Sequence, residues 1–485
     1  MRILRNSHLK HPVTPIYSSI FRILFALILV AGPVLGQFGA AASAATLEQT
    51  VHIKVNGEQQ SWKNQPLIIK GTTFVPLRDV VDSVKGTLKW NAPTKTATIT
   101  YGRDKLVHQA GSESMKVNHV HLTSSVSSRT VNGILMVPVR LVANALKADI
   151  KVQRMASGQM SVNIETDKVS LLNNEVASVD SYLREIHYPG MALIARKGEV
   201  LLRQGYGLAD EQTLNRPDQK TRIASLSKSF TAASILSLAE KGKLDVQDPI
   251  SNYISGIPKG DEITLHMLLS QTSGLPSAFG RGEGTPLEET VEEIRHKTLK
   301  FKPGSAYLYS NSGYVLLAYV IEQVSGMSYA DYVQQTILKP LGMNNSGEAS
   351  RKVHTISGFV AKDNKWVTAP YYVSQSGSGT IYSTVDDMLR WDRALYSDQI
   401  LSQDTIEQMY KPYSDKNYGY AWILKKKNEN RTVFHNGSGG GFATAFSRNL
   451  SDDITIILLG NHAGMDMTSL LDDVEAKTAE ALNLN

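Results

Sequence analysis

The apolar and polar positions divide the chain into a strand-rich first part and a second part whose helices lie between two groups of strands. Residues alternate between apolar and polar in Val51–Val55, as expected for a strand with one buried face. Longer apolar stretches fill the middle of the chain, and short apolar runs return near its end. We therefore predict an α/β (α+β) second domain. Its antiparallel sheet combines N- and C-terminal strands, with a helical subdomain inserted between them.

The elements expected in this second domain follow from apolar runs and their boundary residues. Thr264 is a candidate cap for a short helix, and Ser383 is a candidate cap for another with Asp386 three residues later. Residues 280–305, rich in charge, Gly and Pro, are predicted to form a surface excursion beside a cleft. The expected strands are 191–195, 200–203, 420–424, 432–435, 442–448 and 453–459, and the expected helices are 223–239, 264–269, 314–326, 327–338, 383–395 and 467–482.

An internal repeat marks the first domain. Gly71-Thr-Thr-Phe-Val-Pro-Leu-Arg78 recurs as Gly133-Ile-Leu-Met-Val-Pro-Val-Arg140. Each copy predicts a strand, a turn into a helix that opens at proline, and a pair of strands. The expected organisation is therefore an export signal at 1–45, the small α+β repeat domain at 46–165, a linker at 166–177 and the second domain at 178–485.

Charge and composition narrow the compartment and the partners. Residues 1–45 hold four basic residues and no acid, followed by an apolar run and a small-residue tract, which is typical of a cleaved signal peptide. Four of the six net positive charges lie there, so the rest of the chain is nearly neutral. Its charge therefore gives no reason to expect nucleic-acid binding. The chain has no cysteine, which excludes disulfides and a thiol nucleophile. We expect a bacterial protein, secreted or associated with the cell envelope, of the Gram-positive type.

Ser225 and Lys228 are the candidate nucleophile and base. They stand three residues apart at the start of an apolar helix, so their side chains share one face. A serine needs a base within hydrogen-bond reach, and a lysine serves only if burial or a nearby cation lowers its pKa. The helix start also offers backbone N–H groups to a developing oxyanion.

Two further segments supply the remaining parts of a hydrolytic site. Tyr309, on a loop before an apolar helix, can transfer a proton if it becomes phenolate-like, and Asn311 can bond both Lys228 and a substrate. His435 ends an apolar strand, and Gly437 and Ser438 follow it. There the N–H of Ser438, with that of Ser225, would form an oxyanion hole, and Gly437 permits close approach to a ligand.

Ser-x-x-Lys, Tyr-x-Asn and His-x-Gly, in this order, resemble the penicillin-recognising serine hydrolases. That family includes class C β-lactamases, D-alanyl-D-alanine carboxypeptidases and related esterases. The runs Leu268–Pro276, Phe301–Gly304 and Pro340–Met343 are also similar. The resemblance implies an acyl-enzyme on Ser225, proton transfer by Lys228 and Tyr309, and no cofactor or metal. Ser7-x-x-Lys10 and His462-x-Gly464 also match single motifs, so the interpretation depends on the three motifs together.

The third motif departs from the common family pattern. His435 stands where many relatives have lysine, and Asn436 where most have Thr or Ser. Because histidine is only partly charged near neutral pH, we expect weaker binding of a substrate carboxylate. The expected substrate is a peptide amide, a β-lactam or a small ester, and peptides derived from peptidoglycan are the candidates for the amide. The alternative is a catalytically silent module that binds or senses the cell envelope.

The doubled Val-Pro-x-Arg pattern resembles the copper amine oxidase N-terminal-like domain of secreted Gram-positive proteins. His119 and His121 would share a strand face, but no third metal ligand is near them in sequence. We expect no copper site. We instead expect residues 46–165 to space, dock or attach the second domain, with the cell envelope as the candidate site of attachment.

Overall fold

The computed structural model describes residues 51–166, 170–278, 285–372, 377–427 and 430–484. The predicted signal peptide at 1–45 lies outside these residues. Residues 49–485 belong to one compact unit. Within the described part, no helix has the length and apolarity needed to cross a membrane.

The two repeat copies fold as the sequence predicts. The first copy gives strand β4 (Thr72–Pro76), helix α1 (Leu77–Ser83) and the strand pair β5 (Thr87–Asn91) and β6 (Thr96–Tyr101). The second gives β11 (Ile134–Pro138), α2 (Val139–Ala145), β12 (Asp149–Arg154) and β13 (Met160–Glu165). In each copy the proline immediately precedes the first helical residue.

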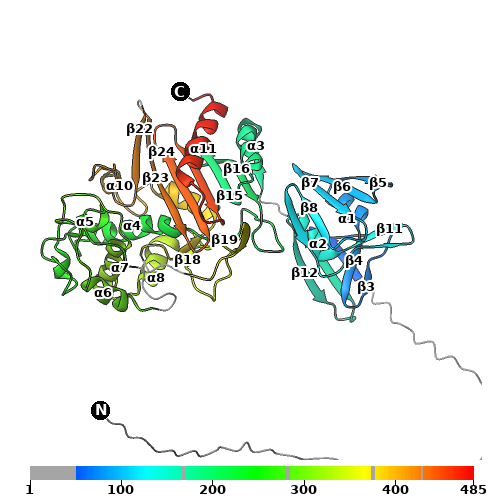
Figure 1. The fold of residues 1–485 in the computed structure, drawn as a ribbon, viewed down its shortest axis with the longest axis horizontal. Coiled ribbons are helices and arrows are strands. Elements are labelled where there is room, and N and C mark those ends of the chain that lie inside the picture. The colour runs from blue at the N-terminus through cyan, green and yellow to red at the C-terminus, as the bar shows by residue number, and fades with distance from the viewer. Residues whose placement is uncertain (1–50, 167–169, 279–284, 373–376, 428–429, 485) are drawn as a thin grey trace, which may run out of the picture. The chain divides into compact units, whose positions relative to one another are not determined.

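The repeat copies share one apolar core. Strands β4 and β11 pair antiparallel with Val75 opposite Val137, and both valines are fully buried. The parallel pairing of β1 (Val51–Val55) with β13 closes a second sheet over this core. Figure 1 shows these strands and helices in blue and cyan.

A seven-stranded sheet forms the centre of the second domain. Its order is β14-β16-β15-β25-β24-β23-β22, and each neighbouring pair of strands is antiparallel. The strands are β14 (Leu171–Leu172), β15 (Gly190–Arg196), β16 (Glu199–Tyr206), β22 (Ile423–Lys427), β23 (Asn430–Gly439), β24 (Phe442–Asn449) and β25 (Ile454–Gly460). Because β15 lies between β16 and β25, one sheet joins both ends of the domain, as predicted. Leu171 and Leu172 fall within the segment that the sequence assigns to the linker.

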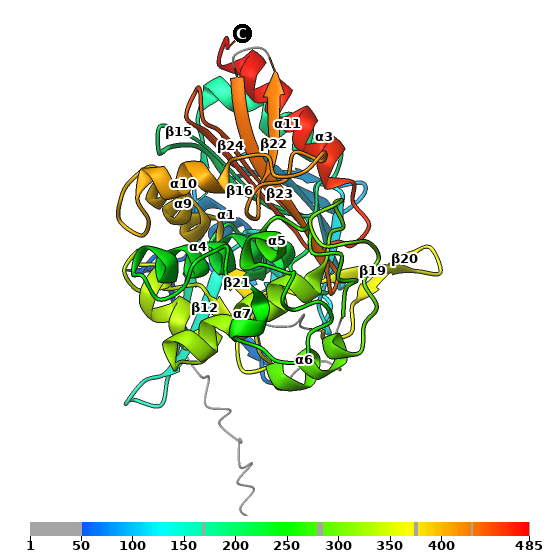
Figure 2. The same ribbon diagram turned by 90° about the vertical axis from the view of Figure 1, so that its left-hand side faces the viewer.

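The two faces of this sheet carry different helices (Figures 1 and 2). Leu193 and Leu459 belong to the core that contains the helical subdomain, whereas Ile194 and Leu458 belong to the core of the terminal helices. This alternation is the two-residue period of a strand. The terminal helices are α3 (Ala177–Glu185) and α11 (Met467–Ala481), and the subdomain side includes α4 (Ser227–Glu240), α5 (Leu265–Leu269), α6 (Leu287–Arg295), α7 (Asn311–Ser325), α8 (Tyr329–Val333) and α9 (Val385–Ala394).

Several elements differ from the sequence prediction. Within the predicted surface excursion, residues 287–295 form α6, which buries Val291 and Ile294 beside α7. The cap of α9 is Thr384, whose hydroxyl accepts a hydrogen bond from the Asp387 N–H, and not Ser383. Ser383 is unavailable because it ends strand β21 (Ile381–Ser383) and bonds the Ser346 hydroxyl at 2.8 Å. The predicted helix 327–338 divides into α8 and a π-helical turn, Gln334–Leu338.

Candidate active site

Ser225 lies in a short 3-10 turn, Ala224–Leu226, immediately before α4. The helix predicted over 223–239 therefore begins as an α-helix only at Ser227, after this 3-10 turn. Ile223 still bonds a strand residue, with its N–H 3.0 Å from the Ile381 carbonyl. Ala224 has a φ of 48°, a left-handed value that is unfavourable for alanine and that recurs at functional sites. Within residues 221–230, Ser225 alone is partly exposed, so the fold presents its side chain to a ligand.

The amine of Lys228 is buried and bonded to three oxygens. Its Nζ lies 3.2 Å from Ser225 Oγ, 2.9 Å from Asn311 Oδ1 and 2.7 Å from the Ser378 carbonyl oxygen. Burial lowers the pKa of Lys228 to about 7. The Asn311 and Ser378 oxygens are acceptors, so a neutral amine donates its two hydrogens to them. Its lone pair is then left for the hydroxyl of Ser225, which is the arrangement of a general base.

Tyr309 is held beside this pair by the main chain and side chain of Gln271. The Leu308 N–H donates to the Gln271 carbonyl at 2.9 Å, and the Ser310 N–H donates to Gln271 Oε1 at 2.8 Å. Lys228 Nζ lies 4.9 Å from the centroid of the Tyr309 ring. Burial raises the pKa of Tyr309, and the hydrogen bond with Ser225 offsets only part of that rise. The structure thus favours a neutral phenol, a proton donor, over the phenolate form considered from the sequence.

Asn311 opens helix α7, where its own N–H donates to Ser277 Oγ at 3.0 Å. This bond satisfies one N–H at the helix start and leaves the side-chain amide to face Lys228. The structure therefore brings together Ser225 and Lys228 from one segment of the sequence with Tyr309 and Asn311 from another.

Strand β23 carries the third motif to the same place. The glycine at 437 is required there, because a Cβ on it would lie 2.7 Å from the Ile223 carbonyl oxygen and 3.1 Å from Ala224 Cβ. The Thr444 hydroxyl on the neighbouring strand donates to the same Ile223 carbonyl at 3.0 Å. Ser438 is exposed beside it. The assignment of the Ser225 and Ser438 N–H groups to an oxyanion hole remains a prediction.

His435 is almost fully buried, with 4% of its surface exposed. Its ring centroid lies 6.0 Å from that of Tyr309. Burial, with a smaller contribution from Lys228, lowers the pKa of His435 to about 3. At neutral pH its ring carries no charge.

Three contributors to the site were not found from the sequence. Ser378 acts through its backbone carbonyl, Gln271 clamps the Tyr309 loop, and Tyr418 bonds His435 at 3.0 Å. Gln271 lies inside the family-like run Leu268–Pro276, which was the one available signal for it. No residue pattern distinguished Ser378 or Tyr418, because their contacts arise only in the folded chain.

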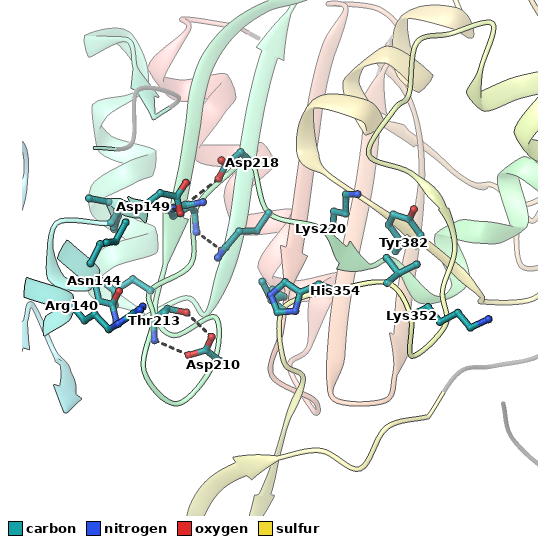
Figure 3. A pocket seen from close by; sticks show the side chains of 18 residues that line it. Arg140, Asn144, Asp149, Asp210, Thr213, Asp218, Lys220, Lys352, His354 and Tyr382 are labelled. Carbon is teal, nitrogen blue, oxygen red and sulfur yellow. Dashed lines mark hydrogen bonds and ion pairs between the residues drawn. The ribbon is translucent and has the colours of Figure 1, made fainter. Parts of the chain in front are cut away.

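A cavity of about 740 Å³ lies apart from the Ser225 site (Figure 3). Residues of α2 and of segments 210–220 and 352–356 line it, and none of the predicted catalytic residues does. Two of its lining carboxylates, Asp149 and Asp218, pair with Arg216 at 2.6 and 3.2 Å. Its polar groups are thus partly used in ion pairs, and it is distinct from the Ser225 site.

The histidine pair of the first domain does not form the strand face expected from the sequence. His119 precedes strand β9 (Val120–Thr123), and its ring stacks on His187 with centroids 4.0 Å apart. Among the described residues, no group of three or more His, Cys, Asp and Glu side chains is placed to hold a metal ion.

The chain belongs to the beta-lactamase family, whose match covers residues 176–479, more than half of its length. Residues 54–157 match the copper amine oxidase N-terminal domain. Both resemblances drawn from the motifs are thereby confirmed. Together with the site, the family makes this chain a serine hydrolase.

Individual relatives agree with this assignment. The Bacillus subtilis protein PbpX is 33% identical over 314 residues, covering 63% of this chain and 78% of PbpX. Penicillin-binding protein 4* of the same organism is 32% identical over 311 residues, covering 56% and 68%. The octameric penicillin-binding protein homologue from Pyrococcus abyssi superposes with a TM-score of 0.58 at 28% identity, covering 64% of this chain and 78% of that one.

Proposed function

We propose that the protein hydrolyses a peptide amide, a β-lactam or a small ester through an acyl-enzyme on Ser225. The observation that carries this proposal is the position of Lys228 Nζ, 3.2 Å from Ser225 Oγ, with two carbonyl oxygens accepting its hydrogens. The penicillin-binding relatives support an amide or β-lactam as the bond that is cleaved.

In the first step, Ser225 Oγ attacks the substrate carbonyl carbon while its proton passes to the neutral amine of Lys228. The C–N or C–O bond of the tetrahedral intermediate then breaks, and the leaving atom takes the phenolic proton of Tyr309. Transfer of the proton from Lys228 to Tyr309 restores both groups. Water attacks the ester carbonyl of the acyl-enzyme next, releasing the acid and regenerating Ser225.

A substrate panel tests this proposal. Nitrocefin, a D-alanyl-D-alanine peptide and a short-chain p-nitrophenyl ester are incubated with wild type and with Ser225→Ala, and product release is measured. We expect turnover of at least one substrate, and Ser225→Ala should lower it by about 10⁶. Turnover of none by wild type would favour the silent binding or sensing module.

We also propose that the protein acts outside the cytoplasm of a bacterium, released or held at the envelope through residues 46–165. The basic and apolar pattern of residues 1–45 and the absence of cysteine support this location. Fractionation of a host that expresses the full chain, with an antibody against the second domain, tests it. Recovery in the cytoplasm alone with residues 1–45 retained would contradict it.

A further inference from the structure

Both ring nitrogens of His435 are bonded within the protein. Nδ1 lies 2.6 Å from the backbone carbonyl oxygen of Asn436. A carbonyl can only accept, so Nδ1 carries the ring hydrogen. Nε2 lies 3.0 Å from the hydroxyl of Tyr418, which is fully buried. In a neutral ring protonated at Nδ1, Nε2 is the acceptor, so Tyr418 donates to it.

Asn436, the next residue of the motif, does not offer a substrate carboxylate a hydrogen bond in place of the positive charge that His435 lacks. The Asn436 side-chain amide donates to Thr468 Oγ1 at 2.8 Å, at the start of α11. Helix α11 packs on one face of the seven-stranded sheet, and α4 packs on the opposite face. Asn436 is therefore directed away from Ser225.

Arg222, the arginine nearest to Ser225 in sequence, also makes its contacts within the protein. Its guanidinium bonds the carbonyl oxygens of Tyr372 and Gly440. Its Cζ lies 5.0 Å from the ring centroid of Tyr371 and 4.5 Å from that of Phe442. A substrate carboxylate could pair with this side chain only by displacing contacts that hold the turn after β23.

We propose that the Ser225 site selects acyl substrates whose leaving group is uncharged, an ester or carboxamide in place of a free carboxylate. In the same proposal, Tyr418 is a positioning residue that holds His435 as its uncharged tautomer. This inference rests on the proposed function and names its substrate class. A carboxylate brought beside Ser225 would lose its water and would find neither a free cation at His435 or Arg222 nor the amide of Asn436, which costs binding.

The test uses two aryl esters of one acyl group, whose leaving phenols carry either a meta-carboxylate or a meta-carboxamide. We expect kcat/KM to be at least about tenfold higher for the carboxamide, the scale of one lost charge-assisted hydrogen bond. Equal values or a preference for the carboxylate would overturn the inference.

A fluorophosphonate probe separates this result from failure of the proposed function. If the enzyme is labelled at Ser225 but prefers the carboxylate ester, the proposed function stands and only the inferred substrate class is overturned. Labelled enzyme that turns over neither ester also overturns the substrate class, because an uncharged aryl ester is then refused. Absence of both labelling and turnover overturns the proposed function itself.

The Tyr418→Phe variant tests the positioning role. Without the hydroxyl, Nε2 is no longer occupied, and the preference for the carboxamide should fall at least about threefold. Tyr307→Phe is the matched control, because its ring lies 5.6 Å from that of Tyr418 and should leave the preference unchanged. His435→Lys, which supplies a cation, should shift the preference further toward the carboxylate. An unchanged preference in both Tyr418→Phe and His435→Lys would overturn the role of this pair.

Discussion

The low pKa of Lys228 makes a quantitative prediction about both activity and stability. Its value of about 7 is roughly 3.5 below the usual lysine value of 10.5, because the amine is buried. At about 1.4 kcal/mol per unit, the folded protein disfavours the ammonium form by about 5 kcal/mol relative to the unfolded chain. The amine acts as a base only when it is unprotonated, so activity should depend on this equilibrium.

The activity assay is the pH dependence of kcat/KM with an uncharged ester, whose own charge does not change. We expect kcat/KM to rise with pH, with a midpoint near 7, and to be about tenfold lower at pH 6 than on the plateau. Lys241→Met, which removes an exposed lysine just after α4, should keep the same profile. A flat profile from pH 5 to 8, or a midpoint near 10, would refute Lys228 as the base.

The stability assay is urea unfolding of wild type and Lys228→Met at several pH values. Between pH 7 and 10 the unfolded lysine holds a proton that the folded one lacks, so wild-type stability should increase with pH. Relative to Lys228→Met, the increase should be about 1.4 kcal/mol per pH unit. It should level off below pH 7, where both states are protonated. A difference between the two proteins that does not change with pH would show that burial does not perturb this amine.

Three further variants test other parts of the account. Tyr309→Phe should lower kcat by about 10² to 10⁴ if the phenol transfers a proton, and near-normal steady-state turnover would remove that role. Gly437→Ala should lower kcat/KM by about 10², because the added methyl group pushes β23 away from Ile223 and Ala224; unchanged kinetics would show that the close approach is not needed. Asp392→Ala should destabilise the fold by about 3–5 kcal/mol in urea unfolding, because it leaves the buried Arg448 without the carboxylate 2.6 Å from its Nε, and a loss under 1 kcal/mol would contradict this.

The elements that the sequence predicted well are those whose signals are local. Thr264 caps α5 by accepting from the Met267 N–H, as its position before an apolar run indicated. Gly326 ends α7 with a φ of 70°, a left-handed value that glycine adopts without strain. The joined sheet was also predictable, because the strands at both ends of the domain needed partners.

The missed features depend on contacts between distant segments. Helix α6 lies in a stretch whose composition resembles a loop, and its few apolar residues pack only because α7 is adjacent. Ser225 was identified by spacing, yet neither its 3-10 turn nor the hydrogen bond from Ile223 to the distant Ile381 could be predicted from that spacing. The neutrality of His435 could not be deduced from the sequence, because it follows from burial of the ring near Lys228 in the folded chain. The chemistry was therefore more predictable than the substrate.

The central claim is a covalent intermediate on Ser225, and peptide mapping by mass spectrometry tests it most directly. Wild type and Ser225→Ala are incubated with benzylpenicillin and, separately, with a fluorophosphonate, then quenched and digested. We expect the mass of at least one reagent on the peptide that contains Ser225, and no such adduct in Ser225→Ala. An unmodified Ser225 with both reagents, or equal labelling of the variant elsewhere, would contradict the account.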